Sequence, residues 1–280
     1  MITKEQKEYL LPKACNAALR AGAAILEIYM GDEEFSIDIK SDSTPITLAD
    51  RRAHSVIKEY LGQTRIPLLS EEGREMLYAE RKDWDLFWMV DPLDGTKEFL
   101  KGNGEFTVNI ALMVDNKPAF GVVYVPYKER LYFSDPEMGS LRRCGIKSDA
   151  QAELGYEDLF RSVDLLPLTT KQNEPLRVAI SRSHNTEETF RIVDGMKREY
   201  PGMEVREQGS SYKFCLIAEG TVDYYPRTSN TYEWDTAAGE AILSLAGGKT
   251  LSLEGNRPLE YNQESLVNPH FACRSKWFND

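Results

Sequence analysis

Acidic side chains follow apolar stretches of the sequence at three places. They are Glu71 and Glu72 after "IPLLS", Asp91 and Asp94 after "LFWMV", and Asp235 where "EWDTAAGEAIL" turns helical. No histidine or cysteine lies within these motifs, so they suit zinc and softer metals poorly. A donor set made only of oxygen suits a hard cation, Mg²⁺ before Ca²⁺ or Mn²⁺. Two Mg²⁺ ions held about 4 Å apart can activate water and stabilise the leaving oxygen of a phosphate ester.

Each acidic motif also has an ordinary structural interpretation. The stretch "DPLDG" is typical of a turn, because Asp, Pro and Gly each favour turn conformations. The pair Glu71 and Glu72 is typical of a solvated surface, and Asp235 at a helix start is typical of an N-cap. The residues alone leave these alternatives open, so the decision depends on the order of the motifs along the chain.

The composition is that of an ordinary soluble globular protein. The 280 residues are 41% hydrophobic and 28% charged, enough for one large core or two packed lobes. A net charge of −11 disfavours nucleic-acid polymers and anionic membranes, which would require a positive surface. No apolar run approaches the ~18 residues of a membrane span, and the N-terminal segment lacks a signal-peptide core. Four scattered cysteines without a CxxC pair predict reduced thiols and a cytoplasmic protein.

Hydrophobic periodicity predicts the elements of the first half of the chain. Small and apolar residues recur at helical spacing over 10–28 and again over 49–60. Short strands lead into the first two acidic motifs, and residues 106–134 are rich in strand formers. We therefore expect two helices and an antiparallel meander in this half.

The second half alternates between strand and helix patterns. Helices are predicted around 186–198, 210–219 and 235–246, each following a short strand, and this alternation indicates a layered α/β arrangement. The stretch before it is polar and weakly periodic. The expected division is an N-terminal α+β lobe at 1–145, a connection at 146–176 and a C-terminal α/β lobe at 177–280.

The order of the motifs decides between the alternatives. "LLSEEG", "WMVDPLDGTKEFL" and "WDTAAGEAIL", in that order, resemble the lithium-sensitive, Mg²⁺-dependent phosphatases of the inositol monophosphatase family. The motifs "TPITLAD", "GEFTVNIALM", "GVVYVP", "SRSH", "GSSYKFCLIAEG" and "YPR" resemble its CysQ-type 3′(2′),5′-bisphosphate nucleotidase branch. The resemblance spans roughly residues 5–270 and implies an α/β/α/β/α sandwich of two packed lobes.

The resemblance also implies metal ligands and a pair that orients water. The implied Mg²⁺ ligands are the carboxylates of Glu71, Asp91, Asp94 and Asp235 and the backbone carbonyl of Leu93. Glu71 is also expected to act in catalysis, together with Asp50 of "TPITLAD" and Thr96, which would orient the attacking water. Glu72 is expected to bind water in the outer coordination shell rather than a third Mg²⁺. From the residues alone, Asp50 and Thr96 have simpler alternatives, a helix-start carboxylate and an N-cap.

The implied substrate contacts come from both lobes. Around the reacting phosphate they are Leu93, Asp94, Gly95, Thr96 and Asp235, with the amides of Gly95 and Thr96 at a helix N-terminus. In the second lobe they are His184, Ser210, Lys213 and Arg227, with a cation on the non-reacting phosphate. From the residues alone, surface charge for Lys213 and Arg227, and a strand-end cap for His184, remain alternatives.

The activity implied by the resemblance is hydrolysis of 3′-phosphoadenosine 5′-phosphate (PAP) to AMP and phosphate. The phosphosulfate PAPS is a second expected substrate, and the reaction is linked to sulfur assimilation. The alternatives are an inositol or sugar monophosphatase on the same metal site and, third, a non-catalytic phosphate-binding protein. Two or three Mg²⁺ ions per site and inhibition by Li⁺ are expected. The expected partner is a small nucleotide bisphosphate, while peripheral association with the inner membrane and the choice between monomer and homodimer stay open.

Overall fold

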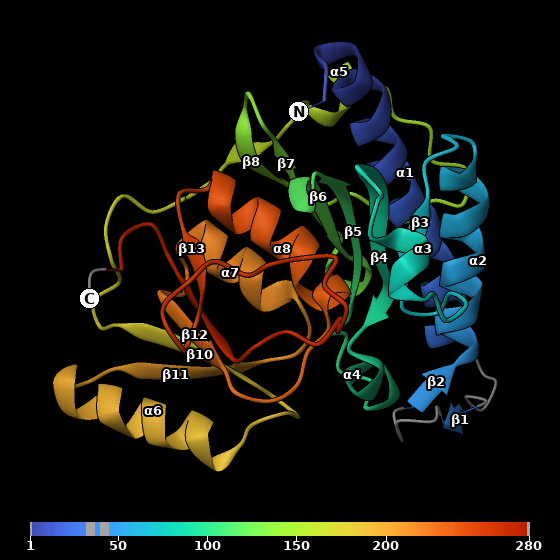
Figure 1. Ribbon diagram of the computed structural model, residues 1–280. Helices are drawn as coiled ribbons and strands as arrows, with labels where there is room; N and C mark the ends of the chain where they lie inside the picture. Colours follow the sequence, from blue (N-terminus) through green and yellow to red (C-terminus); the bar gives the residue numbers. More distant parts are fainter. Residues whose placement is uncertain (1, 32–36, 40–44, 279–280) are drawn as a thin grey trace.

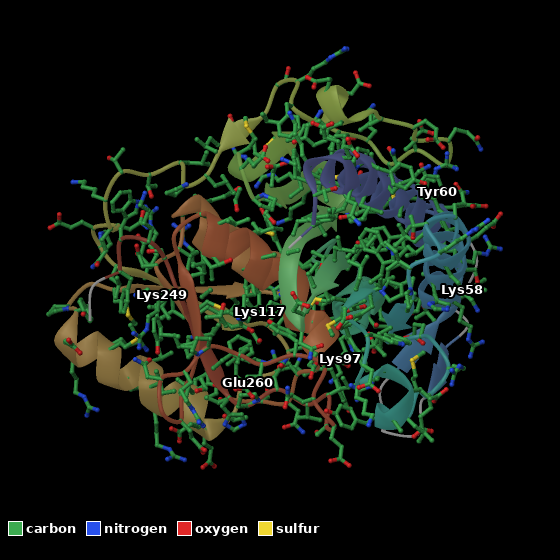
Figure 2. The ribbon with its side chains drawn as sticks, turned by 45° about the horizontal axis from the view of Figure 1, so that its top comes forward. Lys58, Tyr60, Lys97, Lys117, Lys249 and Glu260 are labelled. Atoms are coloured by element: carbon green, nitrogen blue, oxygen red, sulfur yellow. The ribbon has the colours of Figure 1, made fainter. Side chains whose placement is uncertain are left out.

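The computed structural model describes residues 2–31, 37–39 and 45–278, which form five layers. Figure 1 shows blue helices on one side of a large sheet, orange helices between this sheet and a second one, and a further helix outside the second sheet. Side chains fill the space between the ribbons (Figure 2), and three hydrophobic clusters of described residues separate the layers. The predicted α/β/α/β/α sandwich is therefore confirmed.

The large sheet is a meander whose neighbouring strands follow one another in the chain. Its strands are β3 (Leu68–Ser70), β4 (Leu86–Asp94), β5 (Thr107–Val114), β6 (Lys117–Val125), β7 (Arg130–Asp135), β8 (Gly139–Cys144) and β9 (Asp164–Leu165). The pair β3 and β4 is parallel, and the other pairs of this sheet are antiparallel. The predicted meander over 106–134 is confirmed. Asp115 and Asn116, with φ of 49° and 57°, form the turn between β5 and β6.

Helices α1 (Lys4–Tyr29) and α2 (Leu48–Gly62) cover the outer face of the large sheet. Their small residues face inward, so that Ala14, Ala18 and Ala21 of α1 are fully buried. Both predicted helices are confirmed. The first begins earlier than predicted, because Thr3 and Gln6 form a capping box ahead of the apolar pattern.

Helices α7 (Tyr212–Glu219) and α8 (Glu233–Leu245) form the central layer. Apolar side chains such as Phe214, Ile217 and Ile242 are buried there, as expected of helices packed between two sheets. α8 lies directly on β6, where a Cβ added to Gly121 would come within 2.2 Å of the carbonyl oxygen of Ala238. A glycine at this position lets the helix that carries Asp235 approach the sheet.

The second sheet contains five strands. In spatial order they are β11 (Glu204–Gln208), β10 (Arg177–Ser181), β12 (Tyr224–Arg227), β14 (Phe271–Arg274) and β13 (Lys249–Ser252). β10 is parallel to β11 and β12, while β14 is antiparallel to its neighbours. Helix α6 (Glu187–Glu199) covers the outer face through a cluster that includes Val178, Ile180 and Val193. The predicted alternation of strand and helix is confirmed.

Short elements complete the described chain. They are β1 (Ile37–Ile39), β2 (Pro45–Thr47), α3 (Tyr78–Arg81), α4 (Thr96–Leu100), the 3₁₀ helix η1 (Pro126–Lys128) and α5 (Tyr156–Leu159). The predicted connection at 146–176 contains α5 and β9, and β9 pairs with β8. The division into lobes stays a prediction, and its outer limits Met1 and Asp280 lie outside the described residues. In the described part of the chain, no helix is both long enough and apolar enough to span a membrane.

Candidate active site

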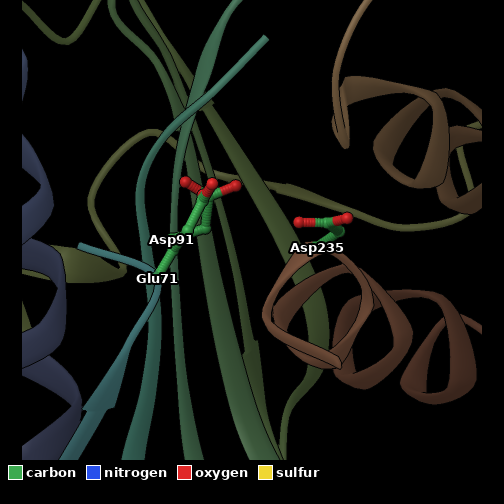
Figure 3. Close-up of side chains that lie close together, drawn as sticks. All are labelled: Glu71, Asp91 and Asp235. Atoms are coloured by element: carbon green, nitrogen blue, oxygen red, sulfur yellow. The ribbon is translucent and has the colours of Figure 1, made fainter. Parts of the chain in front are cut away.

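The parallel pairing of β3 with β4 brings two predicted metal ligands together. Ser70 lies in register with Val90, and the next residue along each strand is Glu71 and Asp91, respectively. Because parallel strands end at the same edge of a sheet, both carboxylates emerge at that edge. Figure 3 shows the side chains of Glu71 and Asp91 next to each other.

A bulge in β4 explains how Asp91 and Asp94 serve one site. Asp91 lies opposite Asn109, whereas Asp94 lies opposite Thr107, so β4 holds an extra residue over this stretch. In a regular strand, residues three apart point to opposite faces, and the bulge reverses this relation. The turn interpretation of "DPLDG" does not describe the stretch up to Asp94, because β4 continues to that residue. The break comes at Gly95, whose φ is 93°.

The third carboxylate approaches from α8. Asp235 is the third residue of this helix, and its carboxylate accepts a hydrogen bond from the backbone N–H of Tyr232 at 2.8 Å. Tyr232 is the N-cap, so the N-cap interpretation of Asp235 was wrong. Glu71, Asp91 and Asp235 each offer an oxygen, and these oxygens lie within 4.8 Å of one another (Figure 3).

The environment of this cluster favours a bound cation. Asp91 is 1% exposed, and burial followed by the charge of Glu71 raises its pKa well above the ordinary value. Burial, followed by the charges of Asp94 and Glu71, does the same for the pKa of Asp235. Crowded carboxylates of this kind require either protons or a cation. The cluster offers only oxygen atoms, so it fits a hard divalent cation.

The fourth carboxylate, that of Asp94 at the end of β4, is bound by Ser211, the N-cap residue of α7. Its Oδ2 accepts hydrogen bonds from the backbone N–H and from Oγ of Ser211, both at 2.5 Å. Asn109 Nδ2 in turn donates to Ser211 Oγ at 3.0 Å. Asp94 is therefore not one of the three clustered carboxylates, although its charge acts on Asp91 and Asp235. Ser211 was not predicted as a site residue, because nothing in its motif distinguished it from the neighbouring residues.

Leu93 supplies backbone atoms to the same site. Its N–H donates to Asp91 Oδ1 at 3.0 Å, which fixes the orientation of that carboxylate. Its carbonyl oxygen lies 3.5 Å from Thr96 Oγ. The predicted carbonyl ligand therefore lies between a carboxylate of the cluster and the predicted water-orienting hydroxyl.

Asp50 and Thr96 are in contact although they lie on different helices. Thr96 Oγ donates to Asp50 Oδ1 at 3.1 Å. The other oxygen, Oδ2, accepts from the backbone N–H and Oγ of Thr47, at 2.7 and 2.5 Å. Asp50 thus closes the capping box of α2 with one oxygen and meets Thr96 with the other. The N-cap alternative for Thr96 was wrong, since Gly95 is the N-cap. Thr47 was missed, although Thr-x-x-Asp is a capping-box pattern that predicts its contact.

These residues line a cavity of about 650 Å³ between the two halves of the fold. Its lining includes Glu71, Asp91, Leu93, Asp94, Gly95, Thr96, His184, Ser210, Lys213, Arg227 and Asp235. The acidic side chains come from the residue after β3, from β4, from Glu98 of α4 and from the start of α8. The basic side chains come from α4, the loop after β10, α7 and β12. Glu72 is not part of the lining, and Asp50 reaches it through Thr96.

Lys213 fixes the backbone that leads into α7, including the carbonyl of Ser210. Lys213 is 3% exposed, and its Nζ donates to the carbonyl oxygens of Gln208 and Ser210, at 3.1 and 2.6 Å. Burial followed by the charge of Arg227 lowers the pKa of Lys213 to about 8. Ser210 has a φ of 55°, an uncommon conformation for a residue other than glycine. The surface-charge alternative for Lys213 was therefore wrong.

Arg227 is partly engaged by the protein. It donates to Ser181 Oγ at 2.6 Å and to the carbonyl oxygens of Ser229 and Asn230, at 3.2 and 3.1 Å. A guanidinium has five N–H donors, so these three bonds leave donors for a ligand. The side chain thus fixes the loop after β12 while it lines the cavity.

His184 lies beside the cations of the cavity and is neutral near pH 7. Its Nε2 is 3.0 Å from Lys97 Nζ. Burial, followed by the charges of Arg227 and Lys97, lowers its pKa to about 4. The strand-end cap alternative does not describe this ring, whose hydrogen-bond partner is a side chain of α4.

A second hollow, of about 700 Å³, lies between α1 and α2. Arginine and glutamate side chains are mixed along its walls, and none of the predicted site residues is among them. Size alone therefore does not identify the functional site, whereas the carboxylate cluster does.

The chain belongs to the inositol monophosphatase family, whose model matches residues 6–277. Two relatives, from Salmonella typhimurium (strain LT2) and Escherichia coli (strain K12), are each named 3′(2′),5′-bisphosphate nucleotidase CysQ. Each is 38% identical to this chain over 265 residues, which cover 94% of this chain and 98% of the relative. The family predicted from the motifs is therefore confirmed.

Solved structures agree with this assignment. The crystal structure of CysQ from Bacteroides thetaiotaomicron has a TM-score of 0.87 and 42% identity, and the match covers 96% of this chain and 98% of that one. The inositol monophosphatase from Anabaena (Nostoc) sp. PCC 7120 has a TM-score of 0.70 at 21% identity, covering 98% and 93%. The second likeness shows the fold alone.

Proposed function

We propose that this chain is a Mg²⁺-dependent phosphatase that removes the 3′-phosphate of PAP and releases AMP and phosphate. The observation that carries the proposal is the near full-length identity of 38% to proteins named 3′(2′),5′-bisphosphate nucleotidase. The cavity supports it, because it combines a carboxylate cluster with cations on the opposite elements. PAPS carries the same 3′-phosphate and is the second substrate that we propose, in sulfur assimilation.

The metal ligands that we propose are Glu71, Asp91, Asp94, Asp235 and the carbonyl of Leu93. When bound, Mg²⁺ polarises a phosphoryl oxygen and lowers the pKa of water. Support comes from the close approach of three of these carboxylates and from the raised pKa of the two aspartates among them. Inhibition by Li⁺ is an expectation from the family resemblance.

Asp50 and Thr96 provide a route for the proton of the attacking water. Thr96 Oγ donates its hydrogen to Asp50 Oδ1, so the lone pairs of this hydroxyl remain to accept a hydrogen from water. As water attacks phosphorus, Oγ can take its proton while its own proton moves to Asp50. Thr47 holds the second carboxylate oxygen and so fixes the orientation of Asp50.

The second lobe supplies the positive charge that a bisphosphate needs. The chain carries a net charge of −11, so a dianion away from the metals requires local cations. Lys213 and Arg227 line the cavity, and Arg227 keeps N–H donors for two parallel hydrogen bonds to a phosphate. In the described residues all four cysteines are unpaired thiols, in agreement with the cytoplasmic setting that we propose.

The test compares phosphate release from PAP and from inositol 1-phosphate at equal concentration with Mg²⁺. Faster release from PAP, lost on adding EDTA, is the expected result. Faster release from inositol 1-phosphate would replace the proposal with the monophosphatase alternative. Binding of both compounds without any release would indicate a phosphate-binding protein. Addition of Li⁺ to the active sample tests the expected inhibition in the same assay.

A further inference from the structure

Among the described residues, four basic side chains line the active-site cavity, and of these only Arg182 is paired with a carboxylate. Lys213 and Arg227 donate to backbone carbonyls and to a serine, as described above. Arg182 forms a two-point ion pair with Glu105, in which Nε and a terminal nitrogen lie 2.7 and 2.8 Å from the two carboxylate oxygens. Its charge is therefore largely neutralised before any substrate binds.

Lys97 is the fourth cation, and its charge is not neutralised. It is an exposed residue of α4, directly after Thr96, and Figure 2 labels it. In the part of the chain that the structure describes, no carboxylate forms an ion pair with Lys97. Its neighbour Glu98 is buried and accepts a hydrogen bond from Ser183 instead.

The partner of Lys97 is a neutral ring. Lys97 Nζ lies 3.0 Å from His184 Nε2, and an ammonium group can only donate, so Nε2 accepts and the proton of the imidazole sits on Nδ1. The low pKa of His184, about 4, agrees with this arrangement. A neutral acceptor orients the ammonium group without cancelling its charge. Residues 91–96 carry proposed metal ligands and are called the metal loop below. Lys97 directly follows this loop, and its side chain points toward the lobe that carries Arg227 and Lys213.

We infer that Lys97 is a specificity-determining residue, whose ammonium group contacts the phosphate of a nucleoside bisphosphate that is not hydrolysed. The inference rests on the proposed function and adds a residue to it. Lys97 belongs to the element that follows the metal loop, yet its Nζ contacts the second lobe at His184. The ammonium group is compact and its side chain is flexible, so it can exchange its hydrogen bond with the neutral imidazole for an ion pair with a phosphate dianion. This exchange adds an attraction between opposite charges.

The experiment uses two substrates that differ by a single phosphate. PAP and 3′-AMP share the adenosine and the scissile 3′-phosphate, and 3′-AMP lacks the 5′-phosphate. In Lys97→Met we expect kcat/KM for PAP to fall about 10- to 100-fold, mainly through KM, the range for a hydrogen bond to a charged group. We expect kcat/KM for 3′-AMP to change less than about twofold, and Lys97→Arg to recover most of the activity on PAP.

The matched control is Lys101→Met. Lys101 follows α4, carries the same charge and donates to Ser183 Oγ at 2.6 Å, but it does not line the cavity. It should leave the ratio of the two substrates unchanged. An equal loss on both substrates in Lys97→Met, an unchanged ratio, or the same effect from Lys101→Met would overturn the inference. A wild-type enzyme that leaves PAP intact would refute the proposed function and this inference with it, whereas activity on PAP with an unchanged ratio refutes only the role of Lys97.

Discussion

Asp91 and Asp235 occupy positions where an ionised carboxylate is unfavourable without a cation. Asp91 is buried and Asp235 is half-buried, both lie among other acidic groups, and burial together with these charges raises the pKa of each. Without metal, these carboxylates must either bind protons or repel one another. A bound divalent cation neutralises their charge and makes the ionised form favourable. A neutral amide at either position removes the repulsion but also removes a proposed ligand, so we expect its effects on stability and activity to have opposite signs.

We predict that Asp91→Asn and Asp235→Asn each lower kcat/KM for PAP by more than about 100-fold. Residues that merely support a metal ligand typically account for 10- to 100-fold, so loss of a ligand costs more. Without metal, each variant should unfold at the wild-type temperature or above it. Mg²⁺ should raise the unfolding midpoint of the wild type and leave that of the variants nearly unchanged.

The control for this pair is Asp83→Asn, which removes an exposed carboxylate ahead of β4. It should retain wild-type activity and the wild-type response to Mg²⁺. A ligand variant that keeps near wild-type turnover would remove that residue from the proposed ligand set. A variant that unfolds well below the wild type without metal would show that its carboxylate supports the fold rather than opposing it.

At the scale of elements, the sequence predicted long periodic segments well. The helices α1, α2 and α6 follow apolar periodicity over three or more turns, a local pattern that survives folding. The bulge in β4 could not be predicted, because it exists only relative to the register of β5. The contact between Ser211 and Asp94 joins residues 117 positions apart, and no local pattern encodes it. The carboxylates themselves were identified because their motifs follow one another along the chain in the order that resembles the family.

Gly95 directly follows the bulged part of β4, and its replacement tests whether close packing fixes this part of the strand. Its φ is 93°, and an added Cβ would lie 3.0 Å from the carbonyl oxygen of Glu105 and 3.3 Å from Ser210 Cβ. We predict that Gly95→Ala destabilises the protein by more than about 1–2 kcal/mol, the cost of a positive φ alone. It should also lower activity strongly, because the metal loop must shift to relieve the contact.

Gly102→Ala is the matched variant for this prediction. Gly102 has a φ of 70°, but an added Cβ would meet no atom within 4 Å. It should show the conformational cost in urea unfolding and keep wild-type kcat/KM. Equal stability and equal activity in the two variants would mean that the close packing around Gly95 does not fix the metal loop.

At the scale of the whole molecule, a buried carboxyl of the central layer links stability to pH. Burial raises the pKa of Glu240 on α8 to about 7, although a hydrogen bond from Tyr261 acts in the opposite direction. The folded state thus keeps a proton that the unfolded chain releases near pH 4.5. The resulting stability is fully present below about pH 4.5 and is lost as pH rises through 7.

Glu240→Gln should remove this dependence. We predict that the variant gains stability relative to the wild type as pH rises from 5 to 8, by at most about 3 kcal/mol. Urea unfolding at several pH values measures the difference. A difference that stays constant over this range would show that Glu240 titrates at its ordinary value in the folded protein.

Glu105, which precedes β5 of the large sheet, connects this sheet to the segments that follow β10 and precede α7. Its carboxylate accepts two hydrogen bonds from Arg182, which follows β10, and one at 2.8 Å from the N–H of Gly209, which precedes α7. Burial raises the pKa of Glu105, but the hydrogen bonds from Arg182 and Gly209 outweigh it and hold the pKa below the ordinary value. This stabilisation is therefore present above about pH 4.5 and is lost as pH falls through the folded-state pKa.

Glu105→Gln should lower the free energy of unfolding at pH 7 by about 1–3 kcal/mol, less than for a fully buried pair because Arg182 is 34% exposed. It should also raise KM for PAP, since the loops that carry His184 and Ser210 lose a common anchor. Glu207→Gln is the control, because Glu207 pairs with the same arginine at 3.4 Å but is 56% exposed, and it should cost at most about 1 kcal/mol. The two costs should converge as the pH falls below the folded-state pKa of Glu105, where this carboxyl is protonated in the wild type. Equal costs at pH 7 would show that the loops are held by their own packing and that the sheets do not depend on this carboxylate.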